Sequence, residues 1–458
     1  MTTTLTLPDH VASRIRELAT LDVETGGVLL ARPVSTEQGK IRLLARDLLE
    51  VPEGAYERRE IQQLLICSDG YVPSLAVAQN SGCVPIWFHT HPGNGSDPSP
   101  SHHDLAVNRA LSDVFRLRAD SPYYGALIVS ADGPRLTFTG SLDDGRVVTP
   151  IDRIWVVGPR LALYRRVGAD RDAIPDIYDR NVRAFGGPIQ SVLADLRIAV
   201  VGTGGTGSAV AEQLIRLGVR HLHLIDPDDL SESNVTRVYG SRLKDVGRPK
   251  VHVLAEHLVD IGGSLDIQPT QSTITQEPTA RSLTDVDVVF GCTDDNAGRM
   301  VLSRLSTYFL VPVIDCGVLL SSSVDDRLDG VHGRVTVLHP GQACLVCRGR
   351  VDVYRARAEL LTSDERDRLV GEGYAPALPG VEPAVVAYTT AVAAAAVAEL
   401  IERLTHYGVE PVPSEVLLRI HDREVSTNNQ DPNPHHYCDP ASGKIGLGFT
   451  PLFLEQTW

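Results

Sequence analysis

The segment from Leu196 to Asp226 restricts the fold of this chain more than any other stretch. It opens with the apolar run RIAVV, continues through the loop GTGGTG and the amphipathic stretch SAVAEQLIRLG, and closes with HLHLID. This order predicts a strand, a tight loop, a helix and a second strand, a βαβ unit of a parallel, doubly wound sheet. A helix that begins in a glycine loop offers N–H groups and a positive dipole end to phosphate. We therefore expect a nucleotide site at Gly202, Gly204, Gly205 and Gly207.

The chain is long enough for more than one domain. Its 458 residues exceed what one hydrophobic core ordinarily supports. Residues 1–150 alternate short apolar runs with turn residues around one helical stretch, which is typical of a compact α+β domain. Residues 151–190 resemble a partly helical connector, and residues 191–458 carry the pattern of a Rossmann-like, doubly wound parallel-sheet domain. The predicted fold class is α/β overall.

The N-terminal domain contains residue types that bind metals. His89 and His91 are two apart at the end of an apolar run, so on a strand both imidazoles lie on one face. Asp104 follows at the start of a predicted helix and supplies a third ligand. Three protein ligands leave one position of a zinc ion for water, which is typical of catalytic zinc. Such a site also needs a carboxylate that takes a proton from the water.

Each residue of this set also has an ordinary structural explanation. Two histidines at a strand end can simply be polar, and Glu24 alone would be a surface carboxylate. Ser101 and Asp104 have the spacing of a helix capping box, which needs no metal. The combination is much more specific than its parts.

The combination resembles the JAB/JAMM metalloprotease family, whose pattern is an upstream Glu, then His-x-His-Pro, then Ser-x-x-Asp. Glu24, the segment HTHP at 89–92 and the segment SHHD at 101–104 match it within roughly the first 140 residues. The resemblance implies a zinc-dependent peptidase or isopeptidase. It also implies roles for five residues: zinc ligands at His89, His91 and Asp104, a general base at Glu24, and a hydroxyl at Ser101 that steadies the tetrahedral intermediate.

One departure from the JAB/JAMM pattern leaves an alternative open. The interval between His91 and Ser101 is longer than is usual in the family. Ser99 has the usual spacing, but that register puts His102 where the family has aspartate. We prefer Ser101 and Asp104 because they keep the carboxylate, and His102 remains a rival ligand.

The second domain carries further motifs after the glycine loop. Asp226 ends the next predicted strand, where an acidic residue can hold a ribose hydroxyl. The stretches PDDLSESNVTRVYG, DVGRPK and GCTDDNAGR follow. With the loop, they resemble the ThiF/MoeB family, which includes the ubiquitin-activating enzymes, over about residues 175–440. The matching residues are Asp226, Asp228, Asn234, Arg237, Lys250, Asp294 and Arg299.

This second resemblance implies an adenylyltransferase that uses ATP and Mg2+. A carboxylate attacks the α-phosphate, pyrophosphate leaves, and an acyl-adenylate remains. Arg237 and Lys250 would neutralise charge on the phosphates, and Asp294 would hold Mg2+. Asp295 replaces a common asparagine and is an alternative ligand. Arg180, in IYDRNVRAFG, matches an arginine that reaches the partner subunit's phosphates in this family, which implies a homodimer.

A second zinc site is predicted near the end of the chain. Cys344 and Cys347 form a Cys-x-x-Cys pair, and His435 and Cys438 repeat that spacing. Together they make a Cys₃His set, which is typical of a closed structural zinc site. The family commonly has Cys-x-x-Cys in both places, and His436 is an alternative to His435.

The two resemblances together predict a bifunctional enzyme of a ubiquitin-like pathway. One half would adenylate the C-terminal carboxylate of a small protein that ends in glycine, and the other would cleave peptide or isopeptide bonds after it. Activation and processing of a sulfur carrier for cofactor or amino-acid synthesis is the nearest alternative, and an NAD-dependent oxidoreductase is a remote one. A conjugating-enzyme-like protein is a further candidate partner.

Composition excludes several classes of partner. The chain has 43 basic and 58 acidic residues, a net charge of −15, which repels nucleic acid. The most apolar stretch, AVVAYTTAVAAAAVAEL, is too short and too interrupted for a comfortable membrane span, so we expect a buried helix or an interface. Seven scattered cysteines and the lack of a leader pattern favour a reducing cytoplasm.

The adenylation half is predicted to lack a thioester-forming cysteine. The segment from Arg348 to Tyr437, where conjugating members of the family carry one, contains no cysteine. Cys292 and Cys316 end apolar runs, where a buried, unreactive thiol is the default. Cys316 is the better remaining candidate because strand ends in such sheets face the ligand crevice.

Overall fold

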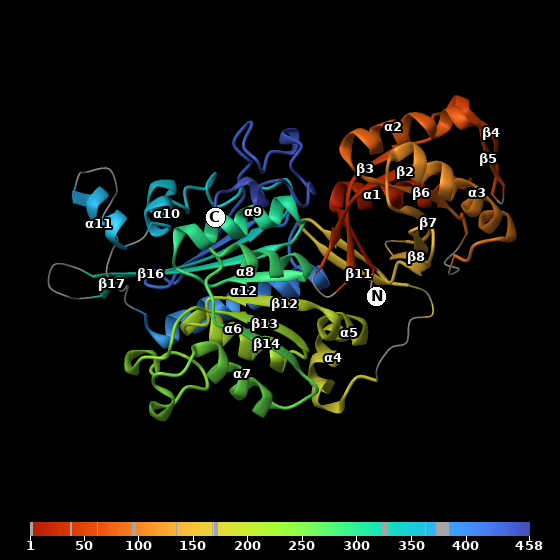
Figure 1. Cartoon of the computed structure of the whole chain (residues 1–458). Helices are drawn as coiled ribbons and strands as arrows, with labels where there is room; N and C mark the ends of the chain where they lie inside the picture. Colours follow the sequence, from red (N-terminus) through yellow and green to blue (C-terminus); the bar gives the residue numbers. More distant parts are fainter. Residues whose placement is uncertain are drawn as a thin grey trace. The chain divides into compact units, whose positions relative to one another are not determined.

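A computed structural model describes residues 3–36, 39–61, 63–93, 98–133, 135–166, 168, 173–322, 328–361, 363–371 and 384–458. The chain forms two compact units (Figure 1). Unit 1 is Met1–Arg171 with Gly446–Phe449, and unit 2 is Asp172–Ile445 with Thr450–Trp458.

Unit 1 is built on a mixed sheet of nine strands in the order β11-β10-β1-β3-β2-β6-β7-β8-β9. The strands are β1 (Thr3–Pro8), β2 (Gly26–Ser35), β3 (Ile41–Glu50), β6 (Val84–Thr90), β7 (Tyr124–Asp132), β8 (Arg135–Asp143), β9 (Val148–Pro150), β10 (Arg153–Val157) and β11 (Leu161–Arg165). The strands β4 (Tyr56–Arg59) and β5 (Leu64–Ile66) form a separate hairpin. The helices of unit 1 are α1 (Asp9–Ala19), α2 (Val72–Ser81) and α3 (His102–Ala119).

The two faces of this sheet have separate apolar cores, because successive strand residues point to opposite sides. In β6, Ile86 and Phe88 belong to the core that includes α1. Trp87 belongs to the other core, which includes Leu75 of α2 and Phe115 of α3. Residues that follow Trp87 at intervals of two therefore lie on the face of the sheet that α2 and α3 cover.

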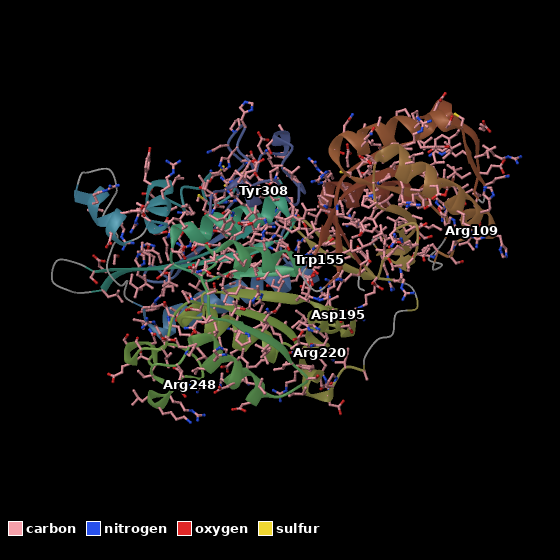
Figure 2. The ribbon with its side chains drawn as sticks, viewed as in Figure 1. Arg109, Trp155, Asp195, Arg220, Arg248 and Tyr308 are labelled. Carbon is pink, nitrogen blue, oxygen red and sulfur yellow. The ribbon has the colours of Figure 1, made fainter. Side chains whose placement is uncertain are left out.

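Unit 1 extends further along the chain than the boundary expected at residue 150. Residues 153–165, expected in a connector, form β10 and β11 at one edge of the sheet. All five residues of β10 are buried, and Trp155, labelled in Figure 2, is fully buried. These strands are short, and β10 pairs in parallel with β1, the first strand of the chain. Local sequence pattern does not reveal such a distant pairing.

Unit 2 contains an eight-stranded sheet in the order β14-β13-β12-β15-β16-β17-β18-β19. The strands are β12 (Arg197–Val201), β13 (His221–Ile225), β14 (Asp266–Thr270), β15 (Val288–Gly291), β16 (Val313–Ser322), β17 (Leu328–Leu338), β18 (Glu415–Arg419) and β19 (Glu424–Asn428). The helices are α4 (Asp179–Phe185), α5 (Gly187–Asp195), α6 (Gly205–Arg216), α7 (Lys250–Ile261), α8 (Glu277–Ser282), α9 (Asn296–Tyr308), α10 (Val353–Glu359), α11 (Ser363–Gly371) and α12 (Val386–Thr405).

The predicted doubly wound α/β fold is confirmed for unit 2. The strands β14, β13, β12, β15 and β16 are parallel, and β17, β18 and β19 continue the sheet in antiparallel pairs. β12 pairs with β13 on one side and β15 on the other, so the chain order reverses at β12. Ligands of such sheets bind at this reversal, beyond the carboxyl ends of the strands. The glycine loop follows β12 at that point.

The Ala-rich stretch forms α12, whose buried residues include Val392, Ala393, Ala396, Val397 and Leu400. Among the described residues, no helix combines the length and the apolar character that crossing a membrane requires.

Candidate functional site

In unit 1 the structure brings His89, His91 and Asp104 together. Each residue offers one ligand atom, and these three atoms lie within 4.8 Å of one another. His89 Nε2 is 3.3 Å and His91 Nε2 is 3.7 Å from the Asp104 carboxylate. Both histidines share the parity of Trp87, so they lie on the face of the sheet that α3 covers, and α3 carries Asp104 in its first turn.

The electrostatics of this cluster suit a cation. His89 is 4% exposed, and among the described residues neither of its ring nitrogens has a hydrogen-bond partner. Burial lowers the pKa of His89, which keeps the imidazole neutral with a lone pair to donate. Burial alone would raise the pKa of Asp104, but contacts with His89 and His91 and hydrogen bonds with Ser101 outweigh it and hold the pKa well below its ordinary value. Two imidazoles beside a carboxylate fit a zinc ion.

Glu24 lies next to this cluster because of the register of two strands. Gly26 of β2 is paired with His89 of β6 in an antiparallel ladder, and continuing that ladder places Glu24 opposite His91. Thr90 N donates to Thr25 O at 2.9 Å between them, which extends the pairing beyond the strands. Glu24 is 9% exposed, and burial raises its pKa to about 7. A carboxylate with such a pKa can both accept and release a proton near neutral pH.

Ser101 is the N-cap of α3 and forms a capping box with Asp104. The Ser101 hydroxyl accepts from Asp104 N at 3.1 Å, and Ser101 N donates to Asp104 Oδ2 at 2.7 Å. A capping box and a metal-binding role for Asp104 are therefore compatible, because the cap fixes the Asp104 carboxylate beside the histidines. His102 is exposed at the first position of α3 and is not part of the cluster, and Ser99 precedes the helix.

Sequence reasoning missed Arg59 of β4. Its guanidinium donates to Glu24 O at 3.2 Å and to Thr25 Oγ1 at 2.7 Å, and it stacks over the ring of Tyr56. The backbone at Glu24 is thus held by the hairpin, where Glu24 N also donates to Glu60 O at 2.9 Å. No local motif marks Arg59, because its role depends on a contact far along the chain.

In unit 2 the glycines of the loop have different functions. Gly202 has φ +88°, and a Cβ there would lie 2.6 Å from Cys292 O. A Cβ on Gly207 would lie 1.8 Å from Gly202 O, so both glycines are required by close backbone packing. Gly204, the N-cap of α6, has open space around its Cβ position, whereas a Cβ on Gly205 would come within 3.1 Å of Thr389. The open side at Gly204 is therefore where a phosphate can approach the helix N-terminus.

Asp226, Asp228 and Lys250 meet beside this loop. Asp226 accepts from Thr203 N at 2.6 Å and from Asp228 N at 3.0 Å, so its carboxylate orders the loop. Lys250 Nζ is 2.7 Å from Asp228 Oδ2 and 3.9 Å from Asp226 Oδ1. Lys250 is 8% exposed, at the first position of α7. A buried ammonium beside a glycine loop is a ready counter-charge for phosphate.

Of the remaining predicted nucleotide residues, Arg237 lies beside the glycine loop, while Asn234 stabilises the turn that precedes Arg237. Asn234 is 8% exposed and accepts from Ser231 N at 3.1 Å, which caps a short 3-10 turn. Arg237 follows that turn and lies beside Gly205, since a Cβ on Gly205 would be 3.4 Å from Arg237 Cβ. Arg180 is exposed on α4.

The turn between β15 and α9 distinguishes Asp294 from Asp295. Asp295 is the N-cap of α9, where its carboxylate accepts from Gly298 N and from the Thr293 hydroxyl. Asp294 is exposed and has no side-chain hydrogen bond to any described residue. Of the two carboxylates, Asp294 is therefore the one without a hydrogen bond to the described residues. Arg299 instead contacts Asp315, which is fully buried and also bound by Arg334 at 2.6 Å.

The second predicted metal set contains His436 rather than His435. Cys344, Cys347, His436 and Cys438 have ligand atoms within 4.8 Å of one another. His436 Nδ1 is 3.5, 3.3 and 3.2 Å from the sulfurs of Cys344, Cys347 and Cys438. Such separations are close to the edges of a tetrahedron around zinc, about 3.8 Å between sulfurs.

His435 lies outside this set. It has φ +65°, and its N–H donates to Asp439 Oδ2 at 2.8 Å. The turn then directs the next residue, His436, toward the thiols, a choice that spacing alone does not make. The cluster also favours a thiolate, because the hydrogen bond with Cys438 lowers the pKa of Cys344 to about 5.

Cys292 directly follows β15, whereas Cys316 lies within β16, the neighbouring strand, and not at its end as expected from the sequence. Cys316 is 4% exposed. A hydrogen bond with Cys316 and then burial raise the pKa of the Cys292 thiol well above its ordinary value. These are the properties of unreactive thiols. Residues 372–383, within the segment where a thioester cysteine would be sought, lie outside the described residues.

The second half of this chain is similar to known proteins. The model of the ThiF family matches residues 178–439, more than half of the chain. The chain is 30% identical over 178 residues to the molybdopterin-synthase adenylyltransferase of Escherichia coli, 38% of this chain and 68% of that protein. It is 29% identical over 160 residues to the sulfur carrier protein ThiS adenylyltransferase of the same organism, 34% of this chain and 60% of that protein. It is 29% identical over 197 residues to the ubiquitin-like modifier-activating enzyme 5 of Oryza sativa, 40% of this chain and 42% of that protein. The glycine loop, the Asp-Asp-Lys cluster and the metal set of unit 2 all fall within the matched residues, and the chain belongs to the ThiF family.

Proposed function

We propose that unit 2 is an adenylyltransferase that uses ATP to activate the C-terminal carboxylate of a small carrier protein. The observation that carries this proposal is the position of Lys250, which is buried beside Asp226 and Asp228. Asp226 in turn accepts from Thr203 N of the glycine loop. Membership of the ThiF family favours ATP over a nicotinamide cofactor as the ligand of that loop. The three relatives are named as adenylyltransferases or as an activating enzyme.

The proposed reaction depends on charge placed around the phosphates. The N–H groups at Gly204 and the α6 N-terminus would bind phosphate oxygens. Lys250 would leave Asp228 to neutralise charge that develops on the phosphates, and Arg237 would do the same from the other side of the loop. Asp294 would hold Mg2+, which neutralises the pyrophosphate that leaves. Positioning and electrostatics then suffice, with no covalent step on the protein.

The carrier is proposed to be a small ubiquitin-like or sulfur-carrier protein with a C-terminal glycine. The relatives include a molybdopterin-synthase adenylyltransferase, an adenylyltransferase of a sulfur carrier protein and an activating enzyme for a ubiquitin-like modifier. The sulfur-carrier alternative therefore fits at least as well as a conjugation pathway. A homodimer, with Arg180 reaching the partner subunit's site, is part of this proposal.

ATP–pyrophosphate exchange tests the adenylation proposal. The full chain is incubated with ATP, Mg2+, labelled pyrophosphate and a small β-grasp protein that ends in Gly-Gly. Exchange should require that protein, and removal of its terminal glycine should abolish exchange because the attacking carboxylate is displaced. If a panel of such carriers supports no exchange, the proposal is wrong.

A second activity is favoured by the cluster in unit 1. We propose that His89, His91 and Asp104 hold a zinc ion, and that unit 1 cleaves peptide or isopeptide bonds that follow the carrier's C-terminus. The supporting observation is that His89, His91 and Asp104 meet where β6 ends and α3 begins, and that Glu24, just before β2, interacts with His91 and Asp104. Zinc would polarise water and the scissile carbonyl.

Glu24 would take a proton from the water and pass it to the leaving amine. The Ser101 hydroxyl accepts from Asp104 N and still has its own hydrogen to donate to a developing oxyanion.

A fusion of the carrier to a short C-terminal peptide tests the peptidase. Cleavage should expose the carrier's glycine and should stop in the Glu24→Gln variant, which loses the base while keeping the zinc ligands. Asp47→Asn, a change of an exposed carboxylate on β3, is the matched control and should cleave normally. A Glu24→Gln protein that cleaves at the wild-type rate would refute the assigned base.

A further inference from the structure

Helix α10 is fastened to the turn that carries Asp294. Glu359, the last residue of α10, accepts from Asn296 Nδ2 at 3.0 Å and from Ala297 N at 2.8 Å. Asn296 Oδ1 in turn accepts at 3.0 Å from the N–H of Asp352, the N-cap of α10. Both ends of α10 thus bind the first residues of α9, which begins two residues after Asp294.

The hydrogen bonds with Glu359 are not required to cap the N-terminus of α9. Asp295 already caps the helix by accepting from Gly298 N. Glu359 adds a second carboxylate at the same N-terminus, where a negative charge is favourable. Its two oxygens also take two separate donors, which fixes direction as well as distance. The added effect is to hold the turn against α10, while Asp294 itself stays exposed and without a partner among the described residues.

We propose that Glu359 is a positioning residue of the nucleotide site, which holds the Asp294 turn in the geometry that binds Mg2+ together with ATP. This inference rests on the adenylation function proposed for unit 2. Without Glu359, Ala297 N and Asn296 Nδ2 lose their acceptor, and the turn is released from α10. The loss acts on the metal-dependent part of nucleotide binding, since the glycine loop and Lys250 belong to other elements.

Equilibrium binding of ATP by calorimetry, with Mg2+ and separately with a chelator, tests the proposal on the full chain. Glu359→Ala should weaken MgATP binding about tenfold, the effect of losing hydrogen bonds to a charged group. Binding of metal-free ATP should stay within about twofold of wild type on the same reasoning. The control Asp364→Ala removes an exposed carboxylate on the neighbouring helix α11 and should change neither value.

A pair of exchanged side chains separates positioning from a loss of folding. In Glu359→Gln the amide nitrogen would face Asn296 Nδ2, two donors in contact, and MgATP binding should weaken. Adding Asn296→Asp supplies an acceptor for that amide and keeps one for Asp352 N, so the double variant should recover most of the MgATP affinity. Equal weakening of metal-free and Mg2+-bound ATP, or no recovery in the double variant, would overturn the inference. Intact MgATP binding without pyrophosphate exchange would instead contradict only the adenylation proposal.

Discussion

Lys250 Nζ lies 2.7 Å from Asp228 Oδ2, in an ion pair at the first turn of α7. The ammonium is buried while the Asp228 side chain is 63% exposed, so an incoming phosphate can replace the carboxylate without moving the lysine far. We predict that Lys250→Ala lowers the rate of ATP–pyrophosphate exchange by about 100-fold, the usual effect of removing one charge-stabilising group. Lys244→Ala, an exposed lysine on the preceding turn, should exchange normally. Comparable exchange by both variants would contradict the role of Lys250.

Two zinc ions per chain are predicted, and two variants should remove them separately. His89→Ala should lose the zinc of unit 1 and its cleavage activity while pyrophosphate exchange persists, because the exchange residues lie in unit 2. Cys347→Ser should lose the zinc of unit 2 and lower its thermal stability, because structural zinc contributes to folding. Metal analysis by mass spectrometry with activity assays checks both. Wild-type protein purified without chelators and free of zinc would refute both sites.

Arg180 is predicted to act across a dimer. If it reaches the partner's phosphates, Arg180→Ala and Lys250→Ala proteins should each exchange far more slowly than wild type. A mixture allowed to exchange subunits should recover part of the activity, because some hybrid sites then contain both residues. Arg183→Ala, a change of a neighbouring arginine that pairs with Asp179, is the matched control. A mixture as inactive as its components would exclude action in trans.

Stability should fall as the pH drops, through His223 of β13. Burial lowers the pKa of His223 to about 4, below the ordinary value of 6.5, while Nε2 lies 2.9 Å from Thr270 Oγ1. The folded state therefore binds fewer protons than the unfolded state in this range. Stability is full above the unfolded pKa and is lost as pH falls from about 6.5 toward 4, by up to about 3 kcal/mol.

Denaturant unfolding of the full chain at several pH values measures this loss. His223→Gln keeps a hydrogen-bonding side chain but removes the titration, so its stability should fall less steeply than that of wild type. His339, whose pKa burial lowers to about 3, should contribute in the same direction. Identical pH dependence of His223→Gln and wild type would contradict the assignment.

No thioester is predicted on the adenylation half. Cys316 is buried, and the proton of Cys292 is held by its hydrogen bond with Cys316 and by burial. The activated carrier should leave as an acyl-adenylate or pass directly to a nucleophile of another protein. Reaction with carrier and ATP, followed by non-reducing electrophoresis, should show no thiol-sensitive adduct. An adduct that disappears in Cys316→Ala would prove this prediction wrong.

The parts of the structure that sequence could predict are local. The segment from β12 through Gly202 to β13 contains a strand, a loop, a helix and a strand in direct succession, so its fold could be predicted from the sequence. The position of His89 and His91 on one face of the sheet could likewise be predicted from the strand pattern alone. The resemblance to the ThiF family is confirmed by the family model, whereas the resemblance of the first half to JAB/JAMM peptidases stays a prediction.

Contacts between elements far apart in the chain could not be predicted from the sequence. The position of Glu24 opposite His91 depends on the register of β2 against β6, and Glu359 meets Asn296 only because α10 packs on α9. The choice of His436 over His435 depends on one residue with positive φ, which histidine adopts as readily at either position. In each case the missing information is a tertiary contact or a turn, which residue spacing does not encode.

The four residues Gly446–Phe449 belong to unit 1, where Arg32 of β2 donates to Leu447 O at 3.1 Å and to Phe449 O at 3.3 Å. A ribosome makes β2 early but supplies these carbonyl groups only after residues 172–445 have been synthesised. Unit 1, which is translated first, is therefore completed only after most of unit 2 has been synthesised. During synthesis, Arg32 of unit 1 therefore lacks these two acceptors until residues 446–449 have been added to the chain.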